Sequence, residues 1–406
     1  MSQSRNIPLD VFDAIERVFD RRESVLEEHS TETMAISDLT HATLAEAIVA
    51  DTDIPSQDFA TMDGYAFDAN DSYPLSIVDA SVYPEDESPS IDSGEAVKIA
   101  TGAPLPAHAN AVLKREDAIV EDGSLRGDEI SVGTYTYARG SNVKSGEQLF
   151  ESRECIGPKD ALLLTDLGIE TVDVYRPFSV GILATGTEIH EGRSRDLDTP
   201  MLTGLVRSWG HRATAEGSVP DTYEKVRDRI EELTRTHDVV MTTGGTSVGK
   251  KDYVVRALHD LGTVDFHRVN LRPGKPIAMA TVETNAATVF AIPGKPVGAH
   301  LVTAIVARPF FTGSAALPTV TRTIDTSVSC PVAGFHYAIP VTYDNQTATP
   351  LGHENSELQI YSETYNPSVL SSSTRATRAR GFVLSENGVE RGEAAEIVPF
   401  TTIQSR

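Results

Sequence analysis

The sequence predicts a multidomain protein that combines an α/β domain with β-rich domains. From Pro177 to about residue 314, short apolar runs alternate with amphipathic helical runs, which is typical of a parallel sheet covered on both faces. Residues 54–149, and those after Leu317, instead carry short β-type runs broken by Gly, Pro, Asp and Ser. A chain of 406 residues is also long enough for two to four domains.

The first part of the chain begins with helical patterns and then changes. Apolar side chains recur at helical spacing through residues 9–29, which predicts a helix. Residues 40–50 ("THATLAEAIVA") predict a second helix with Thr40 as its cap. Residues 54–149 predict a strand-rich domain, either a barrel or a small sandwich. Residues 157–169 predict a short helix that leads into a strand over "TVDVYR".

The α/β region predicts strands and helices in alternation. Its buried strands include "FSVGILATG" and "HDVVMTTGG", and its helices are "PMLTGLVRSWG", "YEKVRDRIEELTRT", "DYVVRALHDLG" and "VGAHLVTAIVARPFF". Each glycine-rich turn of this region follows the carboxyl end of a strand, where open α/β sheets bind ligands. After Leu317, many Thr, Ser and Val residues with turn signals predict a small C-terminal β domain.

The composition is strongly acidic. Fifty-nine acids against 35 bases give a net charge of −24, and only nine of the bases are lysine. Such a surface resembles that of proteins from salt-loving organisms, while an ordinary acidic cytoplasmic protein is the alternative. Nucleic-acid binding is disfavoured, because a phosphate backbone requires a basic face. An anionic ligand would therefore need a local cluster of cations.

The sequence also limits the compartment. No apolar run is long enough to cross a membrane, and the first 28 residues lack an apolar signal core. We therefore expect a cytoplasmic protein without membrane association. Cys155 and Cys330 lie far apart without metal-binding spacing, which favours buried, inert thiols.

Residues 239–253 ("VVMTTGGTSVGKKDY") link a predicted strand to a predicted helix. Gly244 and Gly245 allow backbone amides to approach an anion, Ser247 adds a hydroxyl, and the next helix directs its dipole there. The spacing matches neither a Walker loop nor the GxGxxG dinucleotide pattern. Asp252 is equally consistent with a helix cap and with a metal ligand.

Two further turns bring carboxylates to the same edge of the sheet. "ILATGTEI" places Thr185, Gly186 and Glu188 just past a buried strand, where a carboxylate can bind a divalent cation or orient water. An exposed glutamate is the ordinary interpretation of Glu188. "SVPDTYEKV" places Asp221 directly before a helix, where capping is the stronger interpretation. With Asp252, however, three carboxylates converge from three loops, which is more suggestive than any one alone.

Two Pro-Gly-Lys-Pro turns, in "VNLRPGKPIAMA" and "FAIPGKPVGAH", each follow a strand-like run. They contribute Arg272, Lys275 and Lys295, which suit an oxyanion or a phosphate. One such turn alone would favour a structural role with solvated lysines. Two of them, with Lys250 and Lys251, form the local cluster of cations that an anionic ligand needs in this acidic chain.

The β-rich region offers less chemistry. "DIPSQDFATMDGYAF" carries Asp58 and Asp63, and "IATGAPLP" carries Thr101, but periodicity predicts only turns there. We find neither a Ser-His-Asp order nor a cysteine nucleophile. His267, His300 and the other histidines are scattered, and we expect them to be non-catalytic.

These residues together resemble the molybdopterin molybdenumtransferase family, the MoeA-type proteins that include the gephyrin E domain. The resemblance runs through nearly the whole chain and rests on eight strings in family order. They are "DFATMDGYAF", "IATGAPLPAHANAVLKRED", "GSNVKSGEQL", "ILATGTEI", "SVPDTYEKV", "TTGGTSVGKKDY", "RPGKPIAM" and "IPGKPVGAH".

The resemblance implies a four-part protomer. Its parts are a helical linker region (1–53, completed by 145–176), an inserted β domain (54–144), an α/β molybdopterin-binding domain (177–314) and a C-terminal β-barrel (317–406). It also implies a homodimer whose active cleft lies between the α/β domain of one protomer and the β insertion of the other. The implied reaction joins molybdate to the dithiolene of adenylylated molybdopterin and releases AMP, with Mg²⁺ as the divalent cation. The adenylyltransferase that supplies this substrate and acceptor molybdoenzymes are the implied partners.

The family's functional positions match individual residues here. The implied catalytic residues are Asp58, Glu188, Asp221 and Asp252, of which Glu188, Asp221 and Asp252 are the implied metal ligands. The implied substrate-binding residues are Thr101, Thr185, Gly186, Gly244, Gly245, Ser247, Gly249, Arg272, Lys275, Pro293, Lys295 and Pro296.

Four positions depart from the family pattern: Gln148, Pro200, Lys295 and Gly298. Gly298 removes a hydroxyl near the expected oxyanion pocket, whereas Lys295 adds a charge. These changes either retune the site for a related oxyanion such as tungstate or mark a weakened paralogue. Two alternatives to the transferase stay open. One is a molybdopterin adenylyltransferase, which needs only the α/β domain, and the other is a non-catalytic cofactor-binding scaffold or carrier.

Overall fold

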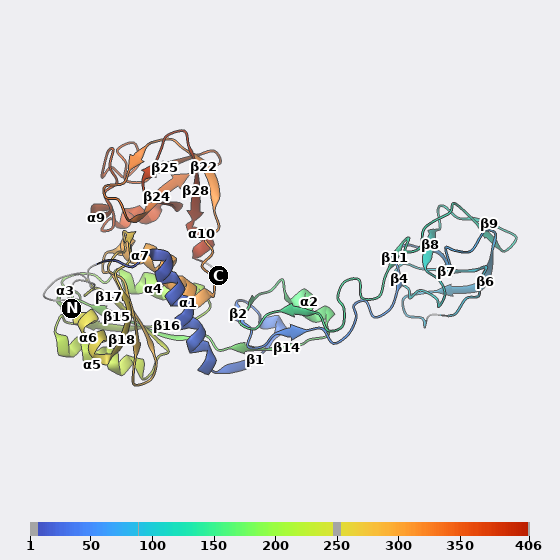
Figure 1. The fold of residues 1–406 in the computed structure, drawn as a ribbon, viewed down its shortest axis with the longest axis horizontal. Helices are drawn as coiled ribbons and strands as arrows, with labels where there is room; N and C mark the ends of the chain where they lie inside the picture. Colours follow the sequence, from blue (N-terminus) through green and yellow to red (C-terminus); the bar gives the residue numbers. More distant parts are fainter. Residues whose placement is uncertain (1–6, 88, 247–252, 405–406) are drawn as a thin grey trace. The chain divides into compact units, whose positions relative to one another are not determined.

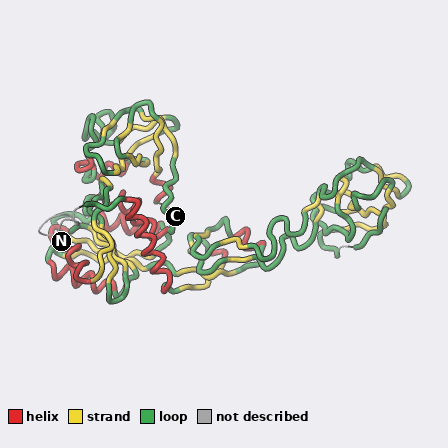
Figure 2. Tube along the Cα trace, in the orientation of Figure 1, coloured by secondary structure: helices red, strands yellow, loops and turns green. Residues whose placement is uncertain are grey.

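The computed structural model describes residues 7–87, 89–246 and 253–404 and divides the chain into two compact units. The insert unit comprises residues 33–39 and 43–173, and the main unit comprises the remaining described residues. Figures 1 and 2 show the helices and strands of both. No helix within these described ranges is both long and apolar enough to span a membrane.

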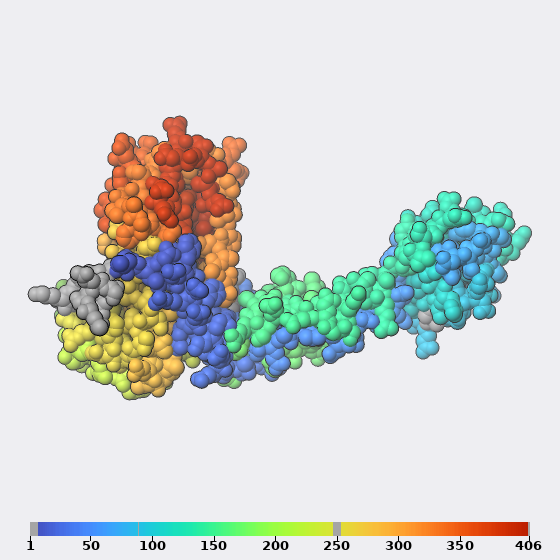
Figure 3. Space-filling model, viewed as in Figure 1, coloured from blue at the N-terminus to red at the C-terminus, as the bar shows by residue number. Residues whose placement is uncertain are grey.

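The main unit begins with helix α1 (Val11–Glu28), which confirms the first predicted helix. The Asp10 carboxylate caps it by accepting a hydrogen bond from the Phe12 amide. The helical spacing buries Val11, Ala14 and Val18 in the core of the unit. Figure 3 shows this N-terminal segment, in blue, lying along the surface of the unit.

A six-stranded sheet forms the centre of the main unit, in the order β16-β15-β17-β21-β20-β18. Its strands are β15 (Ser179–Thr185), β16 (Arg212–Val219), β17 (Val239–Thr243), β18 (Gly262–His267), β20 (Ala278–Val282) and β21 (Thr288–Ile292). The parallel arrangement that the sequence predicts holds from β16 to β21. At the other edge β20 and β18 run antiparallel to their neighbours, because residues 283–287 are too few for a crossover from β20 to β21.

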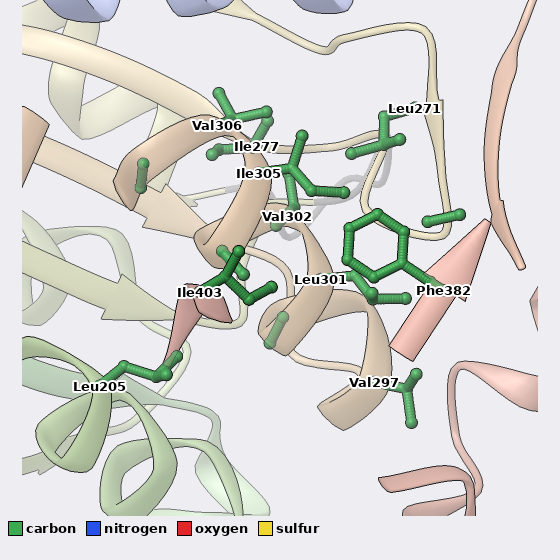
Figure 4. Close-up of a cluster of buried hydrophobic side chains, with 14 of the residues drawn as sticks. Leu205, Leu271, Ile277, Val297, Leu301, Val302, Ile305, Val306, Phe382 and Ile403 are labelled. Atoms are coloured by element: carbon green, nitrogen blue, oxygen red, sulfur yellow. The ribbon is translucent and has the colours of Figure 1, made fainter. Parts of the chain in front are cut away.

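Helices cover both faces of this sheet, as predicted. They are α4 (Asp198–Ser208), α5 (Tyr223–Thr234), α6 (Tyr253–Leu261), α7 (Pro296–Val302) and α8 (Arg308–Thr312). Leu183 and Val240 face the cluster made with α5 and α6, while Ile182 and Met241 face the one made with α1, α4, α7 and α8. Figure 4 shows part of this second cluster, which includes side chains from the C-terminal β domain.

The last predicted helix is interrupted by a π-helical turn, η3 (Thr303–Ala307), between α7 and α8. Pro309 explains the interruption, because it lacks the amide that would bond to the Ile305 carbonyl and its ring crowds that carbonyl.

The C-terminal residues form a closed β-barrel, which confirms the expected C-terminal β domain. Its strands are β22 (Val320–Ile324), β24 (His336–Tyr343), β25 (Thr347–Pro350), β26 (Gly381–Ser385) and β28 (Ala394–Pro399). The ring closes because β24 pairs with both β25 and β26. One short strand of the α/β part, β19 (Leu271–Arg272), pairs with the start of β24 and joins a predicted site turn to the barrel.

The insert unit is strand-rich, as predicted, and its largest element is a single six-stranded sheet in the order β8-β5-β7-β6-β10-β9. These strands are β5 (Gly64–Phe67), β6 (Leu75–Val82), β7 (Glu95–Ile99), β8 (Ala111–Lys114), β9 (Ile119–Glu121) and β10 (Ser124–Arg126). Neighbouring residues of one strand, such as Ala66 and Phe67, belong to different apolar clusters. The sheet therefore has an apolar cluster on each face.

Shorter elements complete the insert unit and its connections. They are β1 (Thr31–Ala35), β2 (Ala42–Thr43), β3 (Ile48–Val49), β4 (Phe59–Ala60), β11 (Thr136–Tyr137), β12 (Gln148–Phe150), β13 (Cys155–Ile156), α2 (Ala161–Asp166) and β14 (Thr171–Tyr175). The predicted short helix before "TVDVYR", and the strand itself, are thus confirmed as α2 and β14.

The predicted helix over residues 40–50 is wrong. The segment holds β2 and β3 instead, and its backbone amides bond to distant residues rather than within a helix. The Leu44 amide donates to the Glu154 carbonyl and the Ala45 amide to the Asp173 carbonyl, each at 2.9 Å. These long-range bonds outweigh the helix propensity of an alanine-rich run, which amounts to less than about 1 kcal/mol per residue.

The cysteine prediction holds for one of the two thiols. Cys330 is partly buried, and burial raises the pKa of its thiol to about 11, which makes it unreactive. Cys155 is exposed, contrary to the prediction, because it lies in the two-residue strand β13, whose alternating side chains bury Ile156 instead.

Candidate active site

Three glycine-bearing turns meet at the carboxyl edge of the main sheet. The Thr185 hydroxyl donates to the Thr243 carbonyl at 2.9 Å, and the Gly244 amide donates to the Ile292 carbonyl at 3.0 Å. A Cβ on Gly244, whose φ is +85°, would lie 2.8 Å from the Thr185 carbonyl oxygen. Only glycine allows this backbone to pass so close to its neighbours.

An acidic cavity of about 190 Å³ opens between these turns. It brings together six of the predicted site residues and adds four that were not predicted. Its lining residues are Thr185, Gly186, Glu188, Ile189, Asp198, Asp221, Thr243, Gly244, Gly245 and Gly294.

Asp221 does not cap helix α5, which was the stronger interpretation of its position. That helix has Thr222 at its N-cap without a side-chain bond. The Asp221 carboxylate instead accepts from the Thr187 amide at 3.2 Å, and the Asp221 amide donates to the Thr187 hydroxyl at 3.0 Å. This reciprocal pair fixes the turns after β15 and β16 against each other and holds the carboxylate at the cavity.

Glu188 is exposed and lies in the first turn of the short helix α3 (Thr187–His190). Its carboxylate folds back over Gly186. A Cβ built on Gly186 would lie only 3.0 Å from Glu188 Oε1. The Glu188 side chain thus lines the cavity despite its exposure.

Asp198, which the sequence analysis did not assign to the site, is the most buried carboxylate of the cavity. Its side chain is only 5% exposed, and its Oδ2 accepts from the Thr243 hydroxyl at 3.2 Å. Its Oδ1 has no hydrogen-bond partner within the described part of the chain. Burial raises the pKa of this carboxyl to about 6, and Asp196 adds to the rise while the Thr243 hydrogen bond opposes it.

A larger basic pocket of about 560 Å³ lies beside the acidic cavity and shares Gly244, Gly245 and Gly294 with it. Its described lining includes three cations and no acidic side chain. The lining residues are Gly244, Gly245, Thr246, Arg272, Pro273, Gly274, Lys275, Pro276, Pro293, Gly294, Lys295, Gly298, Pro367, Ser368 and Ser371. The two Pro-Gly-Lys-Pro turns thus converge on one pocket.

The barrel holds the cations of the basic pocket in place. The Arg272 guanidinium lies 3.9 Å from the centre of the Phe335 ring, and Lys275 Nζ lies 5.3 Å from the same ring centre. Lys295 Nζ donates to the Ser368 carbonyl at 2.9 Å. Burial, with the nearby Arg272 and Arg268 charges, lowers the pKa of Lys275. An anion in the pocket would relieve that repulsion.

The remaining predicted residues are distributed as follows. Pro293 lines the basic pocket, whereas Pro296 is the first residue of α7 and is not part of the lining. Ser247, Gly249 and Asp252 lie outside the described residues, as do Lys250 and Lys251.

Asp58 and Thr101 belong to the insert unit. The Asp58 carboxylate accepts from the Arg139 amide at 2.6 Å. Thr101 donates through both its amide and its hydroxyl to Asp63 Oδ1, each at 2.8 Å, and these bonds lower the pKa of Asp63. The "MDGY" turn therefore positions Thr101, a role that periodicity did not indicate.

The chemistry of the acidic cavity fits Mg²⁺, because the charged donors of its described lining are all carboxylate oxygens, and one of these has no hydrogen-bond partner among residues 7–87, 89–246 and 253–404. Among the described residues, no three Asp, Glu, His or Cys side chains form a group that could hold a metal ion by themselves. Proteins commonly bind Mg²⁺ through one or two carboxylates together with substrate phosphates, so a cation here would need oxygens of the substrate to complete its coordination.

Comparisons with protein families match segments in both units of the chain. Residues 181–313 match the family described as "probable molybdopterin binding domain". Residues 9–168 match the family described as "MoeA N-terminal region (domain I and II)".

Individual relatives and a solved structure agree. The chain is 31% identical over 281 residues to the molybdopterin molybdenumtransferase of Haemophilus influenzae, covering 66% of this chain and 69% of that one. It is 29% identical over 311 residues to that of Staphylococcus aureus, covering 72% and 73%. The crystal structure of the molybdopterin biosynthesis protein MoeA from Pyrococcus horikoshii has a TM-score of 0.72 at 25% identity, covering 97% of this chain and 99% of that one. The chain therefore belongs to the molybdopterin molybdenumtransferase family.

Proposed function

We propose that this protein joins molybdate to the dithiolene of adenylylated molybdopterin and releases AMP. The observation that carries the proposal is the contact between the two cavities, which share Gly244, Gly245 and Gly294. A substrate that spans both cavities would place a phosphate group beside a divalent cation in the acidic cavity. The molybdate that reacts with this substrate would lie in the basic pocket, among Arg272, Lys275 and Lys295. The names of the family's relatives support the transfer of molybdenum to molybdopterin.

The basic pocket would bind the anionic reactants. In a chain with net charge −24, three cations without an opposing carboxylate in the described lining create a local attraction for phosphate and molybdate. Because the barrel fixes these cations before substrate arrives, they would stabilise the charge that develops without costly reorganisation.

The acidic cavity would act on the phosphoanhydride. Glu188 and Asp221 would hold Mg²⁺, and Asp252 is the third predicted ligand. When bound, Mg²⁺ would neutralise phosphate charge and so make the phosphoanhydride easier to cleave. Asp221 is held in place by Thr187, so its carboxylate would keep one position through the reaction.

The proposal extends to assembly and compartment. We propose a homodimer in which Asp58 and Thr101 of a second copy complete the site, an adenylyltransferase and molybdoenzymes as partners, and a cytoplasmic location. Light scattering should give the mass of two chains, and a monomer would contradict the dimer.

We also propose salt adaptation, which predicts a higher unfolding midpoint in multimolar than in dilute KCl, since salt screens self-repulsion. An unchanged midpoint would contradict it.

One assay tests the reaction. The protein is supplied with adenylylated molybdopterin, Mg²⁺ and molybdate, and AMP and active cofactor are followed. We expect AMP release that depends on molybdate. In a parallel assay with molybdopterin, ATP and Mg²⁺, consumption of ATP without molybdate would favour an adenylyltransferase, and binding of adenylylated molybdopterin without AMP release in the first assay would favour a scaffold or carrier.

A further inference from the structure

Asn270 joins three segments of the main unit, although it is not in the described lining of either cavity. Its backbone amide donates to the Leu9 carbonyl at 2.8 Å, and its backbone carbonyl accepts from the His336 amide at 2.7 Å. Its side-chain oxygen accepts from the Val11 amide at 2.8 Å, and its side-chain nitrogen donates to Asp10 Oδ2 at 2.9 Å. One residue therefore connects the start of α1, its own turn and strand β24 of the barrel.

The turn that contains Asn270 also carries two cations of the basic pocket, Arg272 and Lys275. The Val269 amide donates to the Lys275 carbonyl at 2.9 Å, so the two sides of this turn bond to each other. Leu9 forms a parallel bridge with the same Val269. The segment before α1 is thus added to the turn like an outer strand, next to the backbone that supports Lys275.

The cations of this turn repel one another. Burial lowers the pKa of Lys275, and the charges of Arg272 and Arg268 lower it further. Like charges on one short turn favour a backbone that lets them move apart. Bonds from the turn to rigid neighbours are therefore needed to keep the cations together before an anion arrives.

The partner of the Asn270 side chain is itself fixed. Asp10 Oδ1 accepts from the Phe12 amide at 2.9 Å and caps α1. Its other oxygen, Oδ2, accepts from Asn270 and also lies 3.5 Å from His336 Nε2. Because α1 packs into the core of the main unit, Asn270 is bonded to the end of a rigid helix and not to a freely moving side chain.

We propose that Asn270 is a positioning residue, which fixes Arg272 and Lys275 in the arrangement that binds an oxyanion in the basic pocket. It acts through the backbone of the turn and does not touch the anion. This inference rests on the proposed function, because it takes the basic pocket to be the oxyanion site of that reaction. Cations that are fixed beforehand bind an anion more tightly, since less conformational freedom is lost on binding.

An exchange of the two side chains tests this role. Asn270→Asp places two carboxylates against each other, and Asp10→Asn places two amides against each other, so each single variant loses the bond. The double variant, Asp10→Asn with Asn270→Asp, again pairs an amide with a carboxylate. It also keeps an acceptor for the Val11 amide and a good capping residue for α1. Asn270→Ala removes both side-chain bonds.

Asn110 offers a matched control in the insert unit. Its side-chain oxygen accepts from the Ala69 amide at 2.8 Å, and its side-chain nitrogen donates to Asp68 Oδ1 at 2.6 Å. It is partly buried, as Asn270 is, and belongs to the described lining of neither cavity. Asn110→Ala therefore removes the same kinds of bond in a different unit of the chain.

The probe is molybdate, whose binding to the full chain is measured by equilibrium dialysis at constant ionic strength, since salt screens charge attraction. We expect Asn270→Ala and Asn270→Asp to weaken molybdate binding at least about fivefold, because the cations are no longer preorganised. The double variant should return to within about twofold of the wild type, and Asn110→Ala should match the wild type.

Asp10→Asn separates positioning from charge. It removes a negative charge, so a simple charge effect would strengthen molybdate binding, whereas loss of the bond to Asn270 should weaken it. Equal molybdate affinity of Asn270→Ala and the wild type would overturn the inference. So would a double variant as weak as Asn270→Asp, or a wild type that binds no molybdate.

Kinetics of molybdate-dependent AMP release distinguish positioning from a loss of folded protein. Fewer folded molecules would lower the apparent kcat alone, whereas misplaced cations should raise the KM for molybdate. Circular dichroism and thermal unfolding show that each variant is folded at the assay temperature.

The wild type separates this inference from the proposed function. Turnover by the wild type with unaltered molybdate affinity in Asn270→Ala would reject the role of Asn270 alone. Absence of turnover would reject the proposed reaction, while dialysis would still decide whether Asn270 positions the cations.

Discussion

The two adjoining cavities of the main unit are built in different ways. The acidic cavity is formed by the sheet's own turns and the start of α4, and its carboxylates are held by Thr187 and Thr243. The basic pocket takes its cations from two Pro-Gly-Lys-Pro turns that are fixed to the barrel through Phe335 and Ser368. The α/β part therefore supplies the carboxylates, whereas the barrel determines where the cations lie.

This difference explains why an α/β domain alone would not be sufficient for the proposed reaction. A domain without the barrel would keep the acidic cavity but would lose the supports of Arg272, Lys275 and Lys295. Variants that act on one cavity and spare the other test this division.

Removing a cation from the basic pocket should have the largest effect. Lys275→Met keeps most of the side-chain volume but removes the charge, so we expect kcat/KM for AMP release to fall about 10²–10³-fold, as for other preorganised electrostatic groups. Lys225→Met, on the exposed face of α5, is the control and should keep wild-type kinetics. A Lys275→Met enzyme within a few-fold of the wild type would contradict the role of the pocket.

Acid should lower the free energy of unfolding through His300, a buried histidine near the basic pocket. Burial lowers the pKa of His300, on α7 near the pocket residue Gly298, to about 4. An unfolded histidine titrates near pH 6.5, so the unfolded chain takes up a proton there that the folded protein excludes. The contribution of His300 to stability is therefore complete above pH 6.5 and declines as the pH falls to about 4, by about 3 kcal/mol.

We expect His300→Gln to reduce this acid-dependent decline, measured as the change in urea unfolding midpoint between pH 7.5 and 4.5. His259→Gln changes an exposed histidine of α6 and should leave the decline as it is in the wild type. An equal decline in His300→Gln and the wild type would show that His300 does not cause it.

The support from the barrel should contribute less than the charge itself. Phe335→Leu removes the ring beneath Arg272 and Lys275, and a cation–π contact is worth about 1 kcal/mol, so kcat/KM should fall about fivefold. Tyr343→Leu removes the ring near Arg322 elsewhere on the barrel and serves as the control. If both variants lose the same activity, the effect belongs to barrel stability and not to the pocket.

Gly298 should give the smallest change. A Cβ at this position would lie 3.6 Å from Gly274 N and 3.8 Å from Ser371 Cβ, which is ordinary contact, so Gly298→Ser should alter stability by no more than about 0.5 kcal/mol. The added hydroxyl should shift the ratio of apparent affinities for molybdate and tungstate a few-fold. Gly298→Ala adds the Cβ without the hydroxyl, and an identical shift in both variants would exclude the hydroxyl as its cause.

The sequence predicts those parts of the site that depend on local patterns. The strand-to-turn runs place Glu188, Asp221 and Gly244 at one sheet edge, because the carboxyl ends of parallel strands meet there. The two Pro-Gly-Lys-Pro turns likewise indicate a common anionic ligand before the fold is known.

The unpredicted parts depend on contacts between distant segments. Asp198 resembles any acid in the first turn of a helix, and only the position of Thr243 and the cavity distinguishes it. Phe335 contacts Arg272 only because β19 pairs with β24. Residues 40–50 form strands because they pair with segments that lie about a hundred residues or more later in the chain.

The central claim is that the two cavities form one site for one reaction, and a double-mutant cycle tests it most directly. Molybdate-dependent AMP release is measured for the wild type, Asp221→Asn, Lys275→Met and the double variant. Because residues that act as a unit have strongly non-additive effects, the double variant should be little slower than the slower single variant. Losses that multiply in the double variant would show that the cavities act independently and would contradict the account.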